Sequence, residues 1–223
     1  MMPVLKDLRE EVRTVFKGKT LDALVPTLLF VLFNVWASLS VAAGVAIGSG
    51  VGLFVYRLIR KKTIWYALFG LLGVVLASGY ALLAGQASDF FLPQLISGTA
   101  TIFIVVLSLV IQKPIAVFLS HLTRGFPLDW YWRKDILPAY REVTLMWAVF
   151  LVARLLVLIS LYTDGDIIAL GWANVVLGFP MTLGVLVLSY LYGIWRLRTL
   201  KGPGVEEFTR GDAPPWKGQT KGF

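Results

Sequence analysis

A stretch of 34 residues without a charged side chain, from Ala23 to Tyr56, most limits what this chain can fold into. A single helix of that length would measure about 50 Å, at about 1.5 Å per residue, and would exceed the roughly 30 Å hydrocarbon core of a bilayer. Asn34, Ser38 and Ser40 interrupt the stretch near its middle. These polar residues favour a tight hairpin of two membrane-spanning helices over one strongly tilted helix.

The rest of the chain holds further apolar runs that approach the roughly 20 residues a helix needs to cross a bilayer. Only 15% of the residues are charged, which is well below the roughly 25% of a soluble domain. The sequence therefore predicts an all-α polytopic membrane protein with a bundle of six transmembrane helices. The expected spans are residues 21–36, 41–58, 64–83, 91–111, 143–161 and 167–195.

The positions of Lys and Arg indicate the orientation, because cytoplasmic loops retain these residues. Of the 21 basic residues, 20 fall in the N-terminal arm, the second and fourth loops and the C-terminal tail, with Arg57 at the border of the second span, and only Arg154 lies in the interior of a span. The arm and the second loop, Arg57 to Lys62, are both basic, so an even number of crossings separates them. We therefore expect a multi-pass protein of the inner membrane with both termini in the cytoplasm.

Three segments are expected to lie outside the spans of the membrane domain, residues 21–198. Residues 1–20 predict an amphipathic helix in the membrane surface, with a soluble helix packed by its apolar face as the alternative. The aromatic run Trp130 to Lys134 is typical of an interfacial anchor. Residues 199–223 are rich in Gly and Pro, which predicts a flexible cytoplasmic tail.

The net charge of +8 points to lipid and not to nucleic acid, because the basic residues lie between apolar runs. The expected partners are the lipid bilayer, anionic lipids on its cytoplasmic side, and further copies of the chain or envelope proteins. The chain has no cysteine, which excludes thiolate catalysis. His121 is the single histidine, and no nucleotide or zinc motif is present. The sequence therefore predicts neither an enzyme nor a cofactor.

Arg154 lies near the centre of the fifth span, where a charge costs about 2.5–3.5 kcal/mol. It is expected either to snorkel to the interface, to form a buried pair, or to contact an anion in a cavity. Its candidate partners are Asp89, Asp164, Asp166, Asn34 and Asn174. The candidate intramembrane polar site consists of Arg154, Asn174, Asn34 and Asp89.

Two further features concern how the helices pack. Gly44, Gly48 and Gly52 lie at four-residue spacing in the second span, which predicts a face for close helix contact within the chain or between subunits. Pro180 lies midway along the last span and is expected to kink it, freeing a carbonyl near Asn174. Transporters use interrupted helices at binding sites, although a packing kink is the commoner explanation.

Several short motifs resemble known families. The first set is Asp89-Phe90-Phe91-Leu92-Pro93, Leu137-Pro138-Ala139-Tyr140, Trp147, Arg154, Leu161-Tyr162 and Gly178-Phe179-Pro180. Over most of residues 20 to 198 it resembles an uncharacterised bacterial family of six-span inner-membrane proteins, a domain of unknown function. The second set is Val25-Pro26-Thr27-Leu28-Leu29-Phe30, Lys113-Pro114-Ile115 and Trp147-Ala148-Val149-Phe150. It resembles the intracellular septation protein A family, although the long last span and the tail depart from that pattern.

Septation proteins of this kind are associated with envelope synthesis and septum formation, so the resemblance implies a non-enzymatic envelope or division-associated scaffold. Neither family has an established reaction, and no catalytic residue is carried over. A small transporter or channel is the alternative, with its polar site around Arg154, Asn174 and Pro180. A water-filled cavity reaching Arg154 would favour transport, and a dry bundle would favour a scaffold.

Reporter fusions test the six-span topology. Fusions after Lys62, Gln86, Gly125, Gly165 and the C terminus are expected to report cytoplasm, outside, cytoplasm, outside and cytoplasm, because basic loops remain in the cytoplasm. Paired phosphatase and fluorescent-protein activities provide the measurement. An external signal after Lys62 contradicts the hairpin, since an odd number of crossings would then precede that loop.

Overall fold

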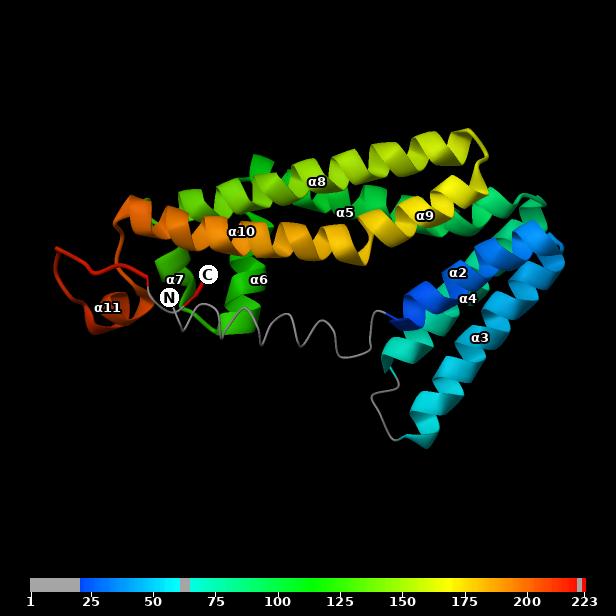
Figure 1. The fold of residues 1–223 in the computed structure, drawn as a ribbon. Coiled ribbons are helices and arrows are strands. Elements are labelled where there is room, and N and C mark those ends of the chain that lie inside the picture. Colours follow the sequence, from blue (N-terminus) through cyan, green and yellow to red (C-terminus); the bar gives the residue numbers. More distant parts are fainter. Residues whose placement is uncertain (1–20, 61–64, 220–221) are drawn as a thin grey trace. The chain divides into compact units, whose positions relative to one another are not determined.

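The computed structural model describes residues 21–60, 65–219 and 222–223 (Figure 1). Over these residues the chain forms α-helices, one short 3-10 helix and connecting turns, without a strand. The predicted all-α class is therefore confirmed for the described part of the chain. The predicted amphipathic helix of residues 1–20 lies outside the described residues, as do Lys61 and Lys62 of the second loop.

Each of the six apolar runs is helical. The first four correspond to α2 Leu21–Trp36, α3 Leu39–Ile59, α4 Trp65–Ala84 and, after the 3-10 helix η1 Ala87–Phe91, α5 Leu92–Val110. The last two correspond to α8 Leu137–Thr163 and to the pair α9 Ile167–Leu177 and α10 Phe179–Leu200. The remaining helices are α6 Ile115–Arg124, α7 Leu128–Tyr131 and α11 Val205–Arg210.

Apolar length marks this chain as an integral membrane protein. Among the described residues, four helical stretches are long and apolar enough to cross a bilayer: Leu39–Ile59, Ala87–Val110, Leu137–Thr163 and Ile167–Leu200. Two shorter apolar helices cover Val25–Trp36 and Leu68–Ala84. Many large apolar side chains are exposed along these helices, among them Phe69, Leu83, Phe103, Val149 and Trp172. Soluble proteins rarely expose so much apolar surface, so a lipid environment accounts for it.

The described residues form two compact units. The first, here called the hairpin unit, contains residues 21–60, 65–98 and 154–181. The second, here called the lobe unit, contains residues 99–153, 182–219 and 222–223. Because α5, α8 and α10 contribute residues to both, each unit is described by itself.

In the hairpin unit, α2 and α3 are separate helices that lie side by side (Figure 1). Helix α2 ends at Trp36, and Ser38 accepts a hydrogen bond from the Val41 N–H at 3.4 Å as the N-cap of α3. The chain therefore turns where the polar residues predict a break. The core beneath the turn includes Phe30, whose ring stacks on that of Phe90 with centroids 3.9 Å apart.

The predicted glycine face of α3 does not form the contacts within this unit. A Cβ added at Gly44, Gly48 or Gly52 would meet no described atom within 4 Å. At Gly50, by contrast, a Cβ would lie 3.1 Å from Cδ1 of Leu71 on α4. The buried small residues of α3 are Ala42, Ala43, Ala46 and Gly50. Alanine thus supplies most of the close-packing face of α3 inside this unit, and contact between subunits through Gly44, Gly48 and Gly52 stays a prediction.

The lobe unit has an aromatic core. Trp130 and Tyr131 of α7 are fully buried and pack against Val117 of α6, Tyr140 of α8 and Leu197 of α10. The prediction that this aromatic run is an interfacial anchor is therefore wrong for Trp130 and Tyr131, whose rings fill the core instead.

Polar contacts also join α8 to α10 in the lobe unit. Glu142 accepts hydrogen bonds from Arg196 at 2.7 and 2.8 Å and from the Tyr192 hydroxyl at 2.7 Å, and Trp147 donates to Ser189 at 3.2 Å.

The substitution Gly50→Leu is expected to destabilise the protein by about 1–3 kcal/mol, because the added side chain would overlap Leu71. Gly48→Leu is the matched control on the open face, and we expect it to change the stability of the monomer by less than about 0.5 kcal/mol. Thermal unfolding in detergent measures both variants. Equal loss of stability in the two would contradict the packing face described for α3.

Candidate functional site

The predicted intramembrane polar residues lie in the hairpin unit, where two of them, Asp89 and Asn174, each form a hydrogen bond with another residue. Asp89 of η1 is buried, and its carboxylate accepts a hydrogen bond from the hydroxyl of Tyr162 near the end of α8. A buried carboxylate needs such a donor, because water no longer solvates it. The observed hydrogen-bond donor to Asp89 is therefore Tyr162, whereas the sequence suggested Arg154 as a possible partner of this carboxylate.

Asn174 of α9 is also buried and is paired with Gln94 of α5. The Gln94 Nε2 group donates to Asn174 Oδ1, and Asn174 Nδ2 donates to the carbonyl oxygen of Leu170 at 3.2 Å. Gln94 was not among the predicted site residues. A signal for it exists in the sequence, because it is an amide side chain in the first turn of a span whose other polar residues are only serine and threonine.

Arg154 joins neither pair. Its Nε atom is buried and has no hydrogen-bond partner among the described residues. Asp166, one of its candidate partners, instead caps α9 by accepting from the N–H groups of Ile168 and Ala169 at 3.1 and 2.9 Å. Asn34 is half-buried on α2 and belongs to neither pair. Snorkelling, a buried pair and an anion contact all stay predictions for Arg154.

The last apolar run is divided at Gly178, two residues before Pro180. A Cβ at Gly178 would overlap the carbonyl oxygen of Asn174, so only glycine fits this close approach. Pro180 lacks the N–H that would bond the carbonyl of the residue four positions earlier. Sequence reasoning expected a kink from the proline, and in the structure the glycine marks the point at which α9 ends.

A second group of polar contacts lies in the lobe unit, in the segment expected to be a flexible tail. Trp130 donates from its indole N–H to the carbonyl oxygen of Pro203 at 2.9 Å. A Cβ at Gly202 would lie 2.9 Å from the carbonyl oxygen of Asp135, and one at Gly204 would lie 2.7 Å from that of Gly218. The glycines that suggested disorder thus allow the backbone to pack closely against the connection between α7 and α8 and against the segment itself.

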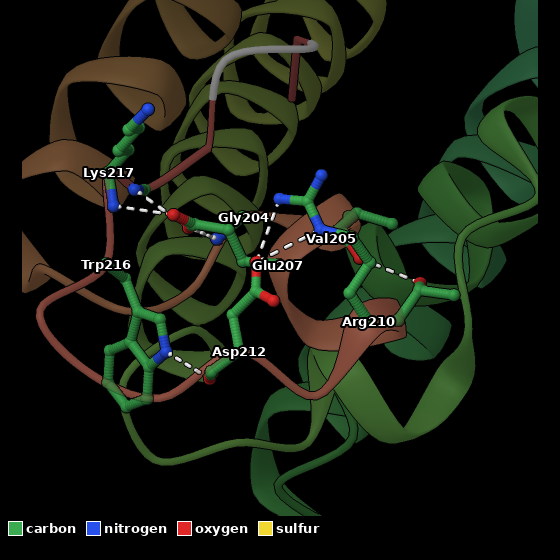
Figure 2. A network of polar contacts seen from close by, with 9 residues as sticks. Gly204, Val205, Glu207, Arg210, Asp212, Trp216 and Lys217 are labelled. Atoms are coloured by element: carbon green, nitrogen blue, oxygen red, sulfur yellow. Dashed lines mark hydrogen bonds and ion pairs between the residues drawn. The ribbon is translucent and has the colours of Figure 1, made fainter.

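Glu207 of α11 holds this segment together (Figure 2). Its carboxylate accepts hydrogen bonds from the backbone N–H groups of Gly204 at 2.8 Å, Lys217 at 2.7 Å and Gly218 at 3.1 Å. The bond from Gly204 and then that from Lys217 do most to hold the pKa of Glu207 below its ordinary value. A single carboxylate therefore closes residues 204–218 into a loop.

Arg133, in the connection between α7 and α8, contacts that loop. Its guanidinium makes two hydrogen bonds to the Asp135 carboxylate at 2.9 and 2.7 Å. The same group lies 5.8 Å from the ring centroid of Phe208 and 5.2 Å from that of Trp216. One arginine thus combines a forked ion pair with two cation–π contacts, a role for which lysine lacks the planar geometry.

Phe223 packs against α8 and α10 of the same unit. Its ring stacks on Tyr140, with centroids 4.3 Å apart and an interplanar angle of 13°. It also covers Gly193 of α10, where an added Cβ would overlap the Phe223 ring. Gly193 therefore leaves the space that this ring fills. Together these contacts pack the C-terminal segment against α7, α8 and α10.

A comparison with protein families matches residues 17–198 to the family described as Protein of unknown function (DUF3159). The chain belongs to this family. The match agrees with the predicted resemblance to an uncharacterised family over residues 20 to 198, and the resemblance to septation protein A stays a prediction. The folded segment after residue 198 lies outside the DUF3159 region. Comparisons with curated proteins and with solved structures gave no match.

A double-mutant cycle tests the amide pair of the hairpin unit. We expect Gln94→Leu and Asn174→Leu to show a coupling of about 0.6 kcal/mol and at most about 1.7 kcal/mol, because each single change removes their shared hydrogen bond. Unfolding free energies in micelles supply the four values. Asn34→Leu is the control and is expected to show no coupling with Gln94→Leu. Additive effects of Gln94→Leu and Asn174→Leu would contradict the pair.

The pH dependence of the lobe tests Glu207. Because its pKa is lowered by folding, its contribution to stability is fully present above the unfolded value of about 4.3 and is lost as the pH falls through the folded pKa. Hydrogen exchange of residues 202–219, corrected for the intrinsic rate, measures the loss. Glu207→Gln should weaken protection at neutral pH and remove this acid dependence, whereas Asp129→Asn, at an exposed acid of the same unit, should retain it. Unchanged protection in Glu207→Gln would show that the carboxylate does not close the loop.

Proposed function

We propose that this DUF3159 family member is a non-enzymatic, six-span scaffold of the inner membrane with both termini in the cytoplasm. Its folded lobe unit would be the docking platform for an envelope or division protein. The observation that supports this proposal is the order of residues 202–219, which Glu207 closes into a loop and which Trp130 of α7 and Arg133 contact. The resemblance to septation protein A supplies the class of partner.

The energetics of ordering support a binding role for this segment. Fixing the backbone of one residue costs about 1–2 kcal/mol, and a segment rich in glycine loses more freedom than most. In the free protein, contacts such as the Trp130–Pro203 hydrogen bond already offset this loss of conformational entropy. A partner that docks on a preformed surface does not have to order it, so more of the contact energy goes into affinity.

The contacts within the hairpin unit fit a structural role as well. Asp89 is satisfied by Tyr162, and Asn174 is satisfied by Gln94 and by the Leu170 carbonyl. Substrate sites present polar groups to a cavity, whereas these groups are directed at one another. The pairs therefore resemble the interhelical hydrogen bonds that join helices in lipid.

A small transporter or channel is the second candidate, and two observations favour it. The buried Nε of Arg154 has no partner among the described residues, although a forked guanidinium suits a carboxylate or phosphate. The helical run is also interrupted at Gly178, close to Asn174, as in transporters that bind substrate at broken helices.

Thiol labelling distinguishes the two candidates, because the chain has no cysteine and Arg154→Cys therefore introduces a single thiol. In proteoliposomes a scaffold is expected to leave Cys at this position unreactive toward charged, water-soluble thiosulfonates. A transporter or channel would admit them through a water-filled cavity. Lys217→Cys, at an exposed position of the lobe, is the control that should react in both cases.

Photocrosslinking tests the docking platform directly. A photoreactive residue in place of Lys217 is expected to give a discrete adduct with an envelope or division protein in native membranes, and Glu207→Gln should remove the adduct by releasing the loop. The same probe at Val149, on the exposed apolar surface of α8, is the control. Labelling of Arg154→Cys without a lobe adduct would reject the scaffold in favour of transport.

A further inference from the structure

Helix α6 lies across the long helices of the lobe unit. Figure 1 shows it running across the direction of α8 and α10. Gln112, with a left-handed φ of 57°, follows the end of α5 at Val110, and α6 begins at Ile115. If α8 and α10 cross the bilayer, α6 must run close to the membrane plane at the end of the unit where α5 stops.

Two hydroxyl groups fix α6 in this position. Ser108 of α5 accepts a hydrogen bond from the Ile115 N–H at 3.2 Å, and Thr144 of α8 accepts one from the Ala116 N–H at 3.3 Å. The first N–H groups of a helix have no partner within the helix, and Pro114 offers no side-chain cap. The start of α6 is therefore tied to two membrane helices, so it cannot turn away without losing these bonds.

The two faces of α6 have different surroundings. Val117 and Ser120 are buried, and Ser120 accepts a hydrogen bond from the Tyr131 hydroxyl at 3.0 Å. On the other side, Phe118 is 43% exposed, Leu119 57% and Leu122 82%. These three residues share one stripe of the helix, because positions i, i+1 and i+4 lie within about 100° of one another.

We infer that α6 is an in-plane membrane anchor that inserts Phe118, Leu119 and Leu122 into the boundary between headgroups and acyl chains. This inference rests on the membrane-spanning part of the proposed function and not on the scaffold role. A short helix parallel to the surface with an outward apolar stripe is the arrangement by which amphipathic helices bind lipid.

Continuity with α5 favours lipid as the occupant of this stripe over a protein partner. Phe103, Val110 and Ile111 expose large apolar side chains along α5 and its end, so the apolar surface reaches the turn before α6. Lys113, in that turn, is exposed and carries the positive charge that suits anionic headgroups. The opposite face of α6 holds the aromatic core of the lobe unit through Val117 and Ser120. The anchor would thereby fix α7, which packs on that face, near the membrane surface.

Single spin labels test this inference in the full chain. Phe118→Cys, Leu119→Cys and Leu122→Cys are labelled separately and reconstituted in phosphatidylcholine vesicles that contain phosphatidylglycerol. We expect collisions with oxygen, which concentrates in lipid, to exceed those with a water-soluble nickel complex by several-fold at all three positions. Asp129→Cys, at an exposed acid of α7, is the aqueous control and should show the opposite order. Phe103→Cys, on the exposed surface of α5, is the lipid control.

The controls separate failure of the inference from failure of the proposed function. If the label at residue 103 is in lipid while the three α6 labels collide freely with nickel, α6 is not an anchor and the inference is overturned. If the α6 labels are shielded from both oxygen and nickel, a protein surface such as a second copy covers the stripe, which also overturns it. Water exposure at residue 103 would instead reject α5 as a span, and the inference would fall together with the membrane topology.

Discussion

A helix in hydrocarbon satisfies its own backbone but gains little by hiding apolar side chains from lipid, which is as apolar as they are. Contacts between such helices therefore depend on close approach and on hydrogen bonds. The hairpin unit uses both. Alanine residues and Gly50 bring α3 close to its neighbours, while the Gln94–Asn174 and Tyr162–Asp89 hydrogen bonds join segments far apart in the sequence. In the lobe unit Glu142 has the same role between α8 and α10.

The helices could be predicted from the sequence because apolar length and charge placement are local properties. The break between α2 and α3 falls at Ser38, and the last run divides beside Gly178-Phe179-Pro180. Partners across the fold were not predictable in this way. Arg154 stood out as the one basic residue in the interior of an expected span, yet Tyr162 donates to Asp89 and Gln94 donates to Asn174. Which helix faces meet depends on packing, and one sequence carries little information about that.

The C-terminal segment shows a different limit of sequence reasoning. Glycine and proline are frequent in disordered segments, but glycine also permits backbone contacts that any side chain would block. Gly202 and Gly204 make such contacts here, and the three N–H groups that converge on Glu207 come from residues up to eleven positions away. Composition cannot separate these two uses of glycine. The role of Glu207 as the acceptor of three backbone N–H groups can be identified only from the folded loop, because two of these groups are distant from it in the sequence.

The contact between Phe223 and Gly193 has a consequence for variation within the DUF3159 family. Position 193 lies inside the region that the family shares, whereas the ring that covers it lies beyond that region. A lineage that acquired such a terminal aromatic group could keep it packed only while residue 193 remained glycine. Relatives without a corresponding ring are free of that restriction and can carry alanine or larger residues there. Residue 193 should therefore vary together with the presence of a ring at the position of Phe223.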